Sequence, residues 1–198
     1  MKIIGVTGGI GSGKSFVMEL LAKRYGVAVI LADEIGHKLM QPREMNYDAI
    51  IEIFGKDILN VDSTIDRKKL GNIVFQDTEK LQLLNSITRE NIKKEIQRQI
   101  LLLQDTGVSI VAIEGALLFE DHYEKFCDEM WFIDAKYSIR VERLIKTRGY
   151  SMEKCEQIIS SQKDRDFFLK HCNRVIVNDG SEEEVIVQLD KIMEQISR

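Results

Sequence analysis

The residues with the clearest chemical meaning form one run near the N-terminus, Gly8 to Ser15, which spells GGIGSGKS and matches G-x-x-x-x-G-K-[ST] in full. Glycines at these places let the backbone wrap closely, so that successive N–H groups point at phosphate oxygens. Lys14 is expected to reach the β- and γ-phosphates of a nucleotide, and the Ser15 hydroxyl to ligate Mg²⁺. A helical pattern opens at Ser15 and adds the positive end of its dipole to this site. The predicted nucleotide-binding residues are Gly9, Gly11, Ser12, Gly13, Lys14, Ser15 and Phe16.

Short motifs elsewhere in the sequence limit which class of nucleotide-binding protein this can be. A GTPase would carry the guanine-reading string N-K-x-D, which the sequence lacks. A D-x-x-G string does occur at Asp33–Gly36, but it follows Lys14 too soon to lie on a switch loop. Motors that act on nucleic acids are usually longer and more basic. A kinase that uses ATP and Mg²⁺ to phosphorylate a small molecule remains.

Asp33 comes two residues after an apolar strand pattern that ends at Leu31. Ligands of a parallel sheet gather beyond the carboxyl ends of its strands. A carboxylate there can accept the proton of an acceptor hydroxyl as that hydroxyl attacks the γ-phosphate. An aspartate before the helical pattern Glu34–Met40 also fits a helix N-cap. The two roles are compatible because a capping bond fixes the rotamer, and we expect Asp33 to be the general base.

Glu114 ends another apolar run, where an acidic residue of such a fold often lies near Mg²⁺. We expect Ser15 and Glu114 to hold the ion, although Glu114 also fits a residue that marks the end of its strand. Glu120, which closes Leu117–Phe119, is expected to be structural. Trp131 lies in an apolar run and is expected in the core rather than stacked on a base.

Phosphoryl transfer spreads negative charge over the γ-phosphate oxygens, so cationic groups are needed on the side opposite the loop. A single arginine is more often solvated than catalytic, but we expect at least one to close on ATP. Arg140 and Arg148 are the preferred candidates for this catalytic role. The full set of candidates is Arg140, Arg143, Arg148 and Arg165.

These residues are embedded in alternating strand and helix patterns, which predict a parallel sheet with right-handed crossovers. The strands lack apolar–polar alternation, as expected of a sheet covered on both faces. The predicted strands are Lys2–Thr7, Val27–Leu31, Ser109–Ile113, Met130–Ile133 and Arg174–Val177. The predicted helices are Ser15–Tyr25, Glu34–Met40, Thr78–Gln104, Ser138–Lys146 and Ser181–Ile196.

The interval between the second and third strands is far longer than a crossover needs. We interpret residues 34–104 as a helical insertion that covers the acceptor, and the polar stretch 146–170 as a mobile lid. The prediction is a three-layer α/β P-loop NTPase fold with a five-stranded parallel sheet. Residues 1–198 are expected to form a single kinase domain with these two embellishments.

The composition is that of an ordinary globular protein. The 198 residues are 44% apolar and 30% charged, with 28 basic and 32 acidic residues and a net charge of −4. This balance argues against a nucleic-acid partner but not against a local cationic pocket. No apolar run is long enough to span a membrane. Three cysteines without metal-ligand spacing suggest reduced thiols, and we expect a cytoplasmic monomer.

In addition, nearly the whole chain resembles the dephospho-coenzyme A kinase family. The resemblance rests on Ile4–Ser15, Ala32–His37, Leu84–Asn85, Leu117–Glu120, Gln162–Arg165, Val175–Ile176 and Asn178–Gly180. It implies phosphorylation of the ribose 3′-hydroxyl of dephospho-CoA by ATP and Mg²⁺, which gives CoA and ADP. It also places Asp33 at the position of the family's catalytic aspartate.

The sequence departs from the family pattern at a few places. Leu31 stands where the family usually has aspartate, Arg89-Glu90 where it has His-Pro, and Ala116 where it has proline. The lid arginine aligns with Thr147 or, after a shift of one residue, with Arg148. Two alternatives therefore stay open: a kinase of another hydroxyl acceptor, and a non-catalytic module that senses nucleotide.

Overall fold

The computed structural model describes residues 1–196 and divides into two compact units. The sheet unit comprises Met1–Ile30 and the chain from Leu103 onward, and the helical unit comprises Leu31–Leu102. The range of the helical unit is close to the insertion expected at 34–104. Within the described residues, no helix has both the length and the apolar character that crossing a membrane requires.

The sheet unit is built on five parallel strands in the order β2-β3-β1-β4-β5. Buried, mostly β-branched residues fill these strands, which explains why no apolar–polar alternation is present in the sequence. In the register of the central strands, Val6 pairs with Glu114 and Ile4 with Glu129. The strands are β1 (Lys2–Thr7), β2 (Ala28–Leu31), β3 (Ile110–Glu114), β4 (Glu129–Asp134) and β5 (Arg174–Val177). All five strand predictions are confirmed, with ends that differ by one residue at most.

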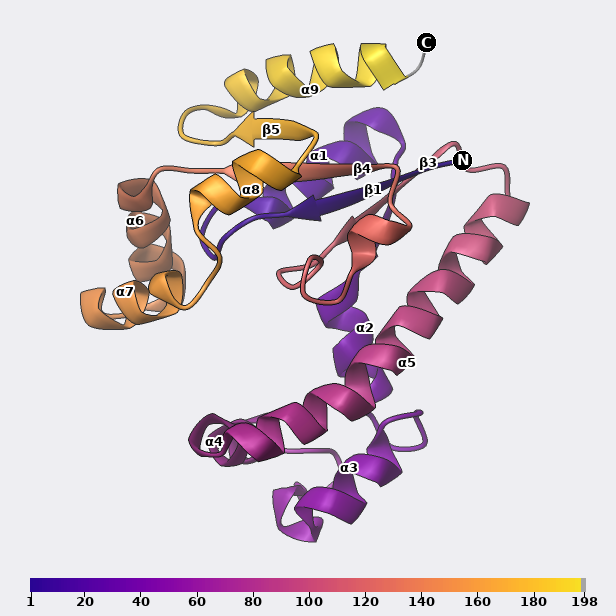
Figure 1. Ribbon diagram of the computed structural model, residues 1–198, viewed down its shortest axis with the longest axis vertical. Coiled ribbons are helices and arrows are strands. Elements are labelled where there is room, and N and C mark those ends of the chain that lie inside the picture. Colours follow the sequence, from indigo (N-terminus) through magenta and orange to yellow (C-terminus); the bar gives the residue numbers. More distant parts are fainter. Residues whose placement is uncertain (197–198) are drawn as a thin grey trace. The chain divides into compact units, whose positions relative to one another are not determined.

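Helices cover both faces of this sheet, as Figure 1 shows with α1 behind the strands and α8 in front of β4. Trp131 is fully buried between these layers, so the prediction that it belongs to the core is confirmed. The helices of the unit are α1 (Lys14–Tyr25), η2 (Tyr123–Lys125), α6 (Tyr137–Arg148), α7 (Met152–Ser160), α8 (Arg165–His171) and α9 (Glu182–Ile196).

The stretch expected to form a lid, 146–170, is mostly helical. Helix α7 begins where the Ser151 hydroxyl accepts a hydrogen bond from Lys154 N–H. Helix α8 begins where the Asp164 carboxylate accepts from Phe167 N–H. Both are side-chain N-caps, which stabilise a helix end by about 1 kcal/mol. Between the two helices lies the short connection that contains Gln162.

The helical unit has a core of its own, formed by the buried residues Ile50, Ile58, Ile65 and Leu70. Its first helix begins at Ala32 with Leu31 as N-cap, so the alternative role of Asp33 as the N-cap is wrong. Strand β2 passes directly into this helix, which places Asp33 in the first turn. A negative charge there is stabilised by the helix dipole. The elements are α2 (Ala32–Leu39), α3 (Tyr47–Phe54), η1 (Lys56–Ile58), α4 (Arg67–Gln76) and α5 (Thr78–Asp105).

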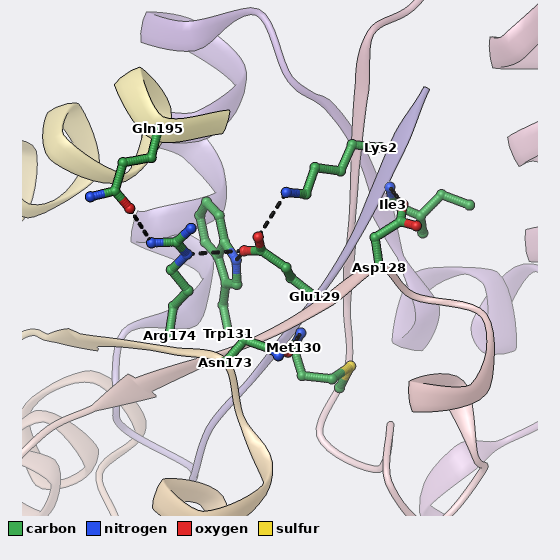
Figure 2. A network of polar contacts seen from close by, with 9 residues as sticks. All are labelled: Lys2, Ile3, Asp128, Glu129, Met130, Trp131, Asn173, Arg174 and Gln195. Carbon is green, nitrogen blue, oxygen red and sulfur yellow. Dashed lines mark hydrogen bonds and ion pairs between the residues drawn. The ribbon is translucent and has the colours of Figure 1, made fainter. Parts of the chain in front are cut away.

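One carboxylate, that of Glu129 at the start of β4, ties the strands together at their amino ends (Figure 2). It accepts hydrogen bonds from Lys2 Nζ at 2.7 Å, Trp131 Nε1 at 2.9 Å and Arg174 Nε at 3.0 Å. Arg174 in turn donates to Gln195 of α9. Burial raises the pKa of Glu129, but the bonds from Arg174, Lys2 and Trp131 outweigh it and lower the pKa to about 2. The charged form is therefore stabilised by folding.

We predict that Glu129→Gln lowers the free energy of unfolding by about 2 kcal/mol near neutral pH, because it removes the charge opposite Lys2 and Arg174. The folded-state pKa lies below the usual value of 4.5, so this contribution is present above pH ~5 and is lost as the pH falls toward 2. Urea unfolding at several pH values measures it. The exposed Glu194→Gln on α9 is the control, and a pH-independent difference from wild type would contradict the prediction.

Candidate nucleotide site

The glycine-rich loop joins the carboxyl end of β1 to the first residue of α1, Lys14. Helix α1 starts one residue earlier than predicted. Gly13 precedes it with φ of +88°, a backbone conformation that favours glycine. A Cβ on Gly13 would lie 2.1 Å from Nδ2 of Asn178, so the position is also closed by a neighbouring side chain. The loop conformation therefore depends on residues far away in the sequence.

Lys14 lies at the mouth of this loop. Its Nζ donates to the carbonyl of Gly8 at 3.0 Å and lies 3.8 Å from Oε1 of Glu114. Glu114 is the last residue of β3 and is 9% exposed, so its carboxylate and the lysine face each other at one end of the sheet. The pairing keeps a compact positive charge beside the loop backbone.

The oxygen atoms of Ser15 and Glu114, which lie next to Lys14, are suitable ligands for Mg²⁺. Ser15 offers a hydroxyl in the first turn of α1, and Glu114 offers a buried carboxylate. Hard oxygen ligands of this kind suit Mg²⁺, which usually keeps several waters and takes its remaining ligands from substrate phosphates. A site with only two protein ligands is therefore sufficient.

The carbonyl of Ser12 is held by two donors from outside the loop. Asn178 Nδ2 donates to it at 2.8 Å, and Arg143 Nη1 donates to it at 3.3 Å. Arg143 Nη2 also donates to the carbonyl of Asn178 at 2.9 Å, which closes a triangle of contacts. Asn178 is 4% exposed and directly follows β5. Reasoning from the sequence missed this role of Asn178, because a single asparagine after a strand carries no signal of what it contacts.

Cavities of 610, 570 and 460 Å³ are lined by residues of the loop. The cavity of 610 Å³, called the larger cavity below, is within the range of small-molecule sites. It brings together five of the seven predicted nucleotide residues with Arg143, Arg148 and Asn178; these five are Gly11, Gly13, Lys14, Ser15 and Phe16. The other two, Gly9 and Ser12, line the cavity of 460 Å³ together with Arg140 and Arg165, and Gly9 also lines the cavity of 570 Å³.

The four candidate arginines have different surroundings. Arg140 Nε donates to the carbonyl of Ile10 at 2.9 Å, and burial lowers the pKa of its guanidinium. Arg143 contacts the loop as described. Arg165 Nε is paired with Oδ2 of the buried Asp134 at 2.8 Å. Arg148 is exposed and lines the larger cavity with Lys14.

Asp33 and His37 belong to the helical unit. Asp33 is exposed in the first turn of α2, two residues beyond the carboxyl end of β2. Nδ1 of His37 lies 3.5 Å from Nη1 of Arg67. Burial and the charge of Arg67 lower the pKa of His37. The imidazole is therefore largely neutral near pH 7.

A family model and sequence relatives show the family of this chain. A family model described as dephospho-CoA kinase matches residues 2–184. The chain is 37% identical over 195 residues to a dephospho-CoA kinase of Carboxydothermus hydrogenoformans, which covers 98% of this chain and 94% of the relative. The crystal structure of TT1252 from Thermus thermophilus matches with a TM-score of 0.84 at 27% identity, covering 98% and 97% of the two chains. A dephospho-CoA kinase from Campylobacter jejuni matches with a TM-score of 0.74 at 29% identity, covering 100% and 98%.

We predict that Gly13→Ala lowers the free energy of unfolding more than Gly107→Ala does, because Gly107 has a similar φ but no close neighbours. Gly107 has φ of +79°, and a Cβ added there would meet nothing within 4 Å, so Gly107→Ala should cost only the left-handed backbone penalty of about 1 kcal/mol. Gly13→Ala adds the clash with Asn178 and should cost about 1–3 kcal/mol more. Chemical unfolding of both variants measures the difference, and equal losses would contradict the packing seen here.

Proposed function

The chain belongs to the dephospho-CoA kinase family, and we propose that it transfers the γ-phosphoryl group of ATP to the ribose 3′-hydroxyl of dephospho-CoA. As a member of this family it is a phosphotransferase of the final step of coenzyme A biosynthesis. The observation that carries the proposal is the phosphate loop with Lys14 and a 610 Å³ cavity, in a chain that matches the family model over residues 2–184.

ATP binds in this proposal with its triphosphate wrapped by the loop. Backbone N–H groups of the loop and the N-terminus of α1 attract the phosphate oxygens. Lys14 contacts the β- and γ-phosphates, where negative charge shifts toward the leaving oxygen during transfer. Ser15 and Glu114 would hold Mg²⁺, which supplies charge neutralisation on the β- and γ-phosphates when bound.

Asp33 acts as the general base. Its carboxylate accepts the proton of the 3′-hydroxyl while that oxygen forms a bond to the γ-phosphorus and the bond to the β–γ bridging oxygen breaks. The products are CoA and ADP. Support comes from the place of Asp33 just beyond the carboxyl end of β2, since ligands of parallel sheets gather at that edge.

Arginines stabilise the transferred group. Arg148 lines the larger cavity with Lys14, and the half-buried guanidinium of Arg140 contacts the loop backbone. Fixed cations aimed at the γ-phosphate oxygens stabilise the transition state more than the ground state. The stretch 146–170 then serves as a lid that brings Arg148 to ATP.

The test of the function is ADP release from Mg-ATP with dephospho-CoA, compared with adenosine, AMP and shikimate as acceptors. We expect turnover that is specific to dephospho-CoA and yields CoA. Turnover with another acceptor instead would favour a kinase of different specificity, consistent with the departures at Arg89-Glu90 and Ala116. ATP binding without turnover of any acceptor would favour a nucleotide-sensing module.

A base role for Asp33 predicts that Asp33→Asn lowers kcat by about 10²-fold or more, because the variant keeps the size of the side chain but cannot take the proton. The affinity for ATP should stay close to that of wild type. Steady-state kinetics and calorimetric ATP binding measure the two effects. Glu34→Gln, the adjacent exposed carboxylate in the first turn of α2, is the matched control. A collapse of ATP affinity in Asp33→Asn would make Asp33 structural.

A further inference from the structure

Three residues from three separate segments form a closed ring of hydrogen bonds at the glycine-rich loop. Ile10 N–H donates to Oε1 of Gln162 at 2.9 Å. Arg140 Nη2 donates to the same oxygen at 3.0 Å. Arg140 Nε donates to the carbonyl of Ile10 at 2.9 Å, which closes the ring. All three contacts are partly buried, and they join the loop, helix α6 and the connection between α7 and α8.

The chemistry of the ring requires a side-chain oxygen at position 162. Both groups that contact it, a backbone N–H and a guanidinium, are donors without acceptor capacity. A carbonyl oxygen has two lone pairs and can satisfy both donors at once. This requirement also assigns the orientation of the Gln162 amide. In the flipped orientation, its NH₂ group would face two other donors and could bond to neither.

The ring places a positive charge directly on the loop. A Cβ on Gly9 would lie 2.2 Å from Nη2 of Arg140, so the guanidinium rests against the backbone of Gly9 with no room for a side chain. The two acceptors bonded to Arg140 within residues 1–196, Ile10 O and Gln162 Oε1, are both uncharged. Neutral acceptors orient a guanidinium without cancelling its charge. The carboxylate of Asp134 also acts on Arg140, but Asp134 is itself paired with Arg165, so the charge of Arg140 stays available to phosphate.

We propose that Gln162 is a positioning residue of the kinase reaction, which fixes the conformation of Ile10 in the phosphate loop and aims Arg140 at the transferred phosphoryl group. The inference rests on the proposed function, because it assigns the purpose of the ring to phosphoryl transfer. Gln162 itself does not touch the reacting atoms in this account. It acts through Arg140 and the backbone of Ile10, and it links the stretch 146–170 to the loop.

Loss of the Gln162 oxygen should lower turnover more than it weakens nucleotide binding. The N–H groups later in the loop and Lys14 remain in place, so ATP is still held. The misaimed guanidinium and the relaxed loop affect the transfer step, where small displacements of positioned groups cost one to two orders of magnitude in rate. A residue that merely stabilises the fold would not produce this separation.

The experiment compares Gln162→Met with Gln157→Met, an exposed glutamine on the neighbouring helix α7. In Gln162→Met we expect kcat to fall about 10-fold or more while KM for ATP changes less than about threefold. Gln157→Met should stay within about twofold of wild type in both. In the Arg140→Met background, Gln162→Met should lower kcat by clearly less than it does in wild type, because the part of the effect that is transmitted through Arg140 is already lost and only the contact with Ile10 remains.

A second readout is independent of turnover. Amide hydrogen exchange at Ile10, followed by NMR on the nucleotide-free protein, should accelerate about 10-fold or more in Gln162→Met and stay unchanged in Gln157→Met. Gln162→Glu keeps an acceptor oxygen at the same reach and should restore slow exchange. If Gln162→Met does not fold, Gln162→Asn, which is one methylene shorter, replaces it and should show the same fast exchange.

Three results would overturn the inference. The first is a kcat of Gln162→Met within twofold of Gln157→Met, and the second is unchanged exchange at Ile10. The third is an effect on kcat of full size in the Arg140→Met background, which would show that Arg140 transmits none of the effect of Gln162. Failure of the proposed function looks different, because wild type itself would then show no turnover with dephospho-CoA.

Discussion

A loop that turns its N–H groups toward a phosphate must turn its carbonyl groups outward, and those carbonyls need donors of their own. This constraint organises the sheet unit. Gly8 O accepts from Lys14, Ile10 O from Arg140, and Ser12 O from Asn178 and Arg143. The donors come from α1, α6 and the end of β5, so the loop keeps its shape only when these elements are packed around it.

The same donors explain how an acidic chain can hold a polyphosphate. The net charge is −4, yet the groups that contact the loop carbonyls include one lysine and two arginines. Long-range attraction by net charge is therefore not what binds the nucleotide in our proposal. Cations fixed at short distance, in partly buried surroundings with a reduced effective dielectric, have the larger influence on a bound phosphate.

At the amino ends of the strands, opposite the loop, a network of hydrogen bonds around Glu129 connects the strands. Glu129 joins Lys2 of β1 to Arg174 of β5, and Arg174 reaches Gln195 of α9. These bonds hold the strands in register at their amino ends, away from the loop. Because β1 runs directly into the loop, an ordered strand also fixes where the loop begins. Stability and site geometry are thus coupled through the same strand.

By itself the sequence determined the loop, the five strands along the chain, the helices that flank them at residues 15–25, 78–104, 138–146 and 181–196, and the family, because each of these depends on residues that are close together in the chain. Lys14 and Ser15 were recognisable from the motif alone, and the continuous apolar runs placed Glu114 at the end of one strand and Asp33 just beyond the end of another. The tertiary structure alone decided which groups surround the loop. Gln162 and Asn178 lie more than 150 residues from their loop partners, so no local pattern connects them. The packing of α6 places Arg140 and Arg143 against the loop, whereas Arg165 at the start of α8 pairs with Asp134. Identical side chains acquire different roles only from their neighbours in the folded chain.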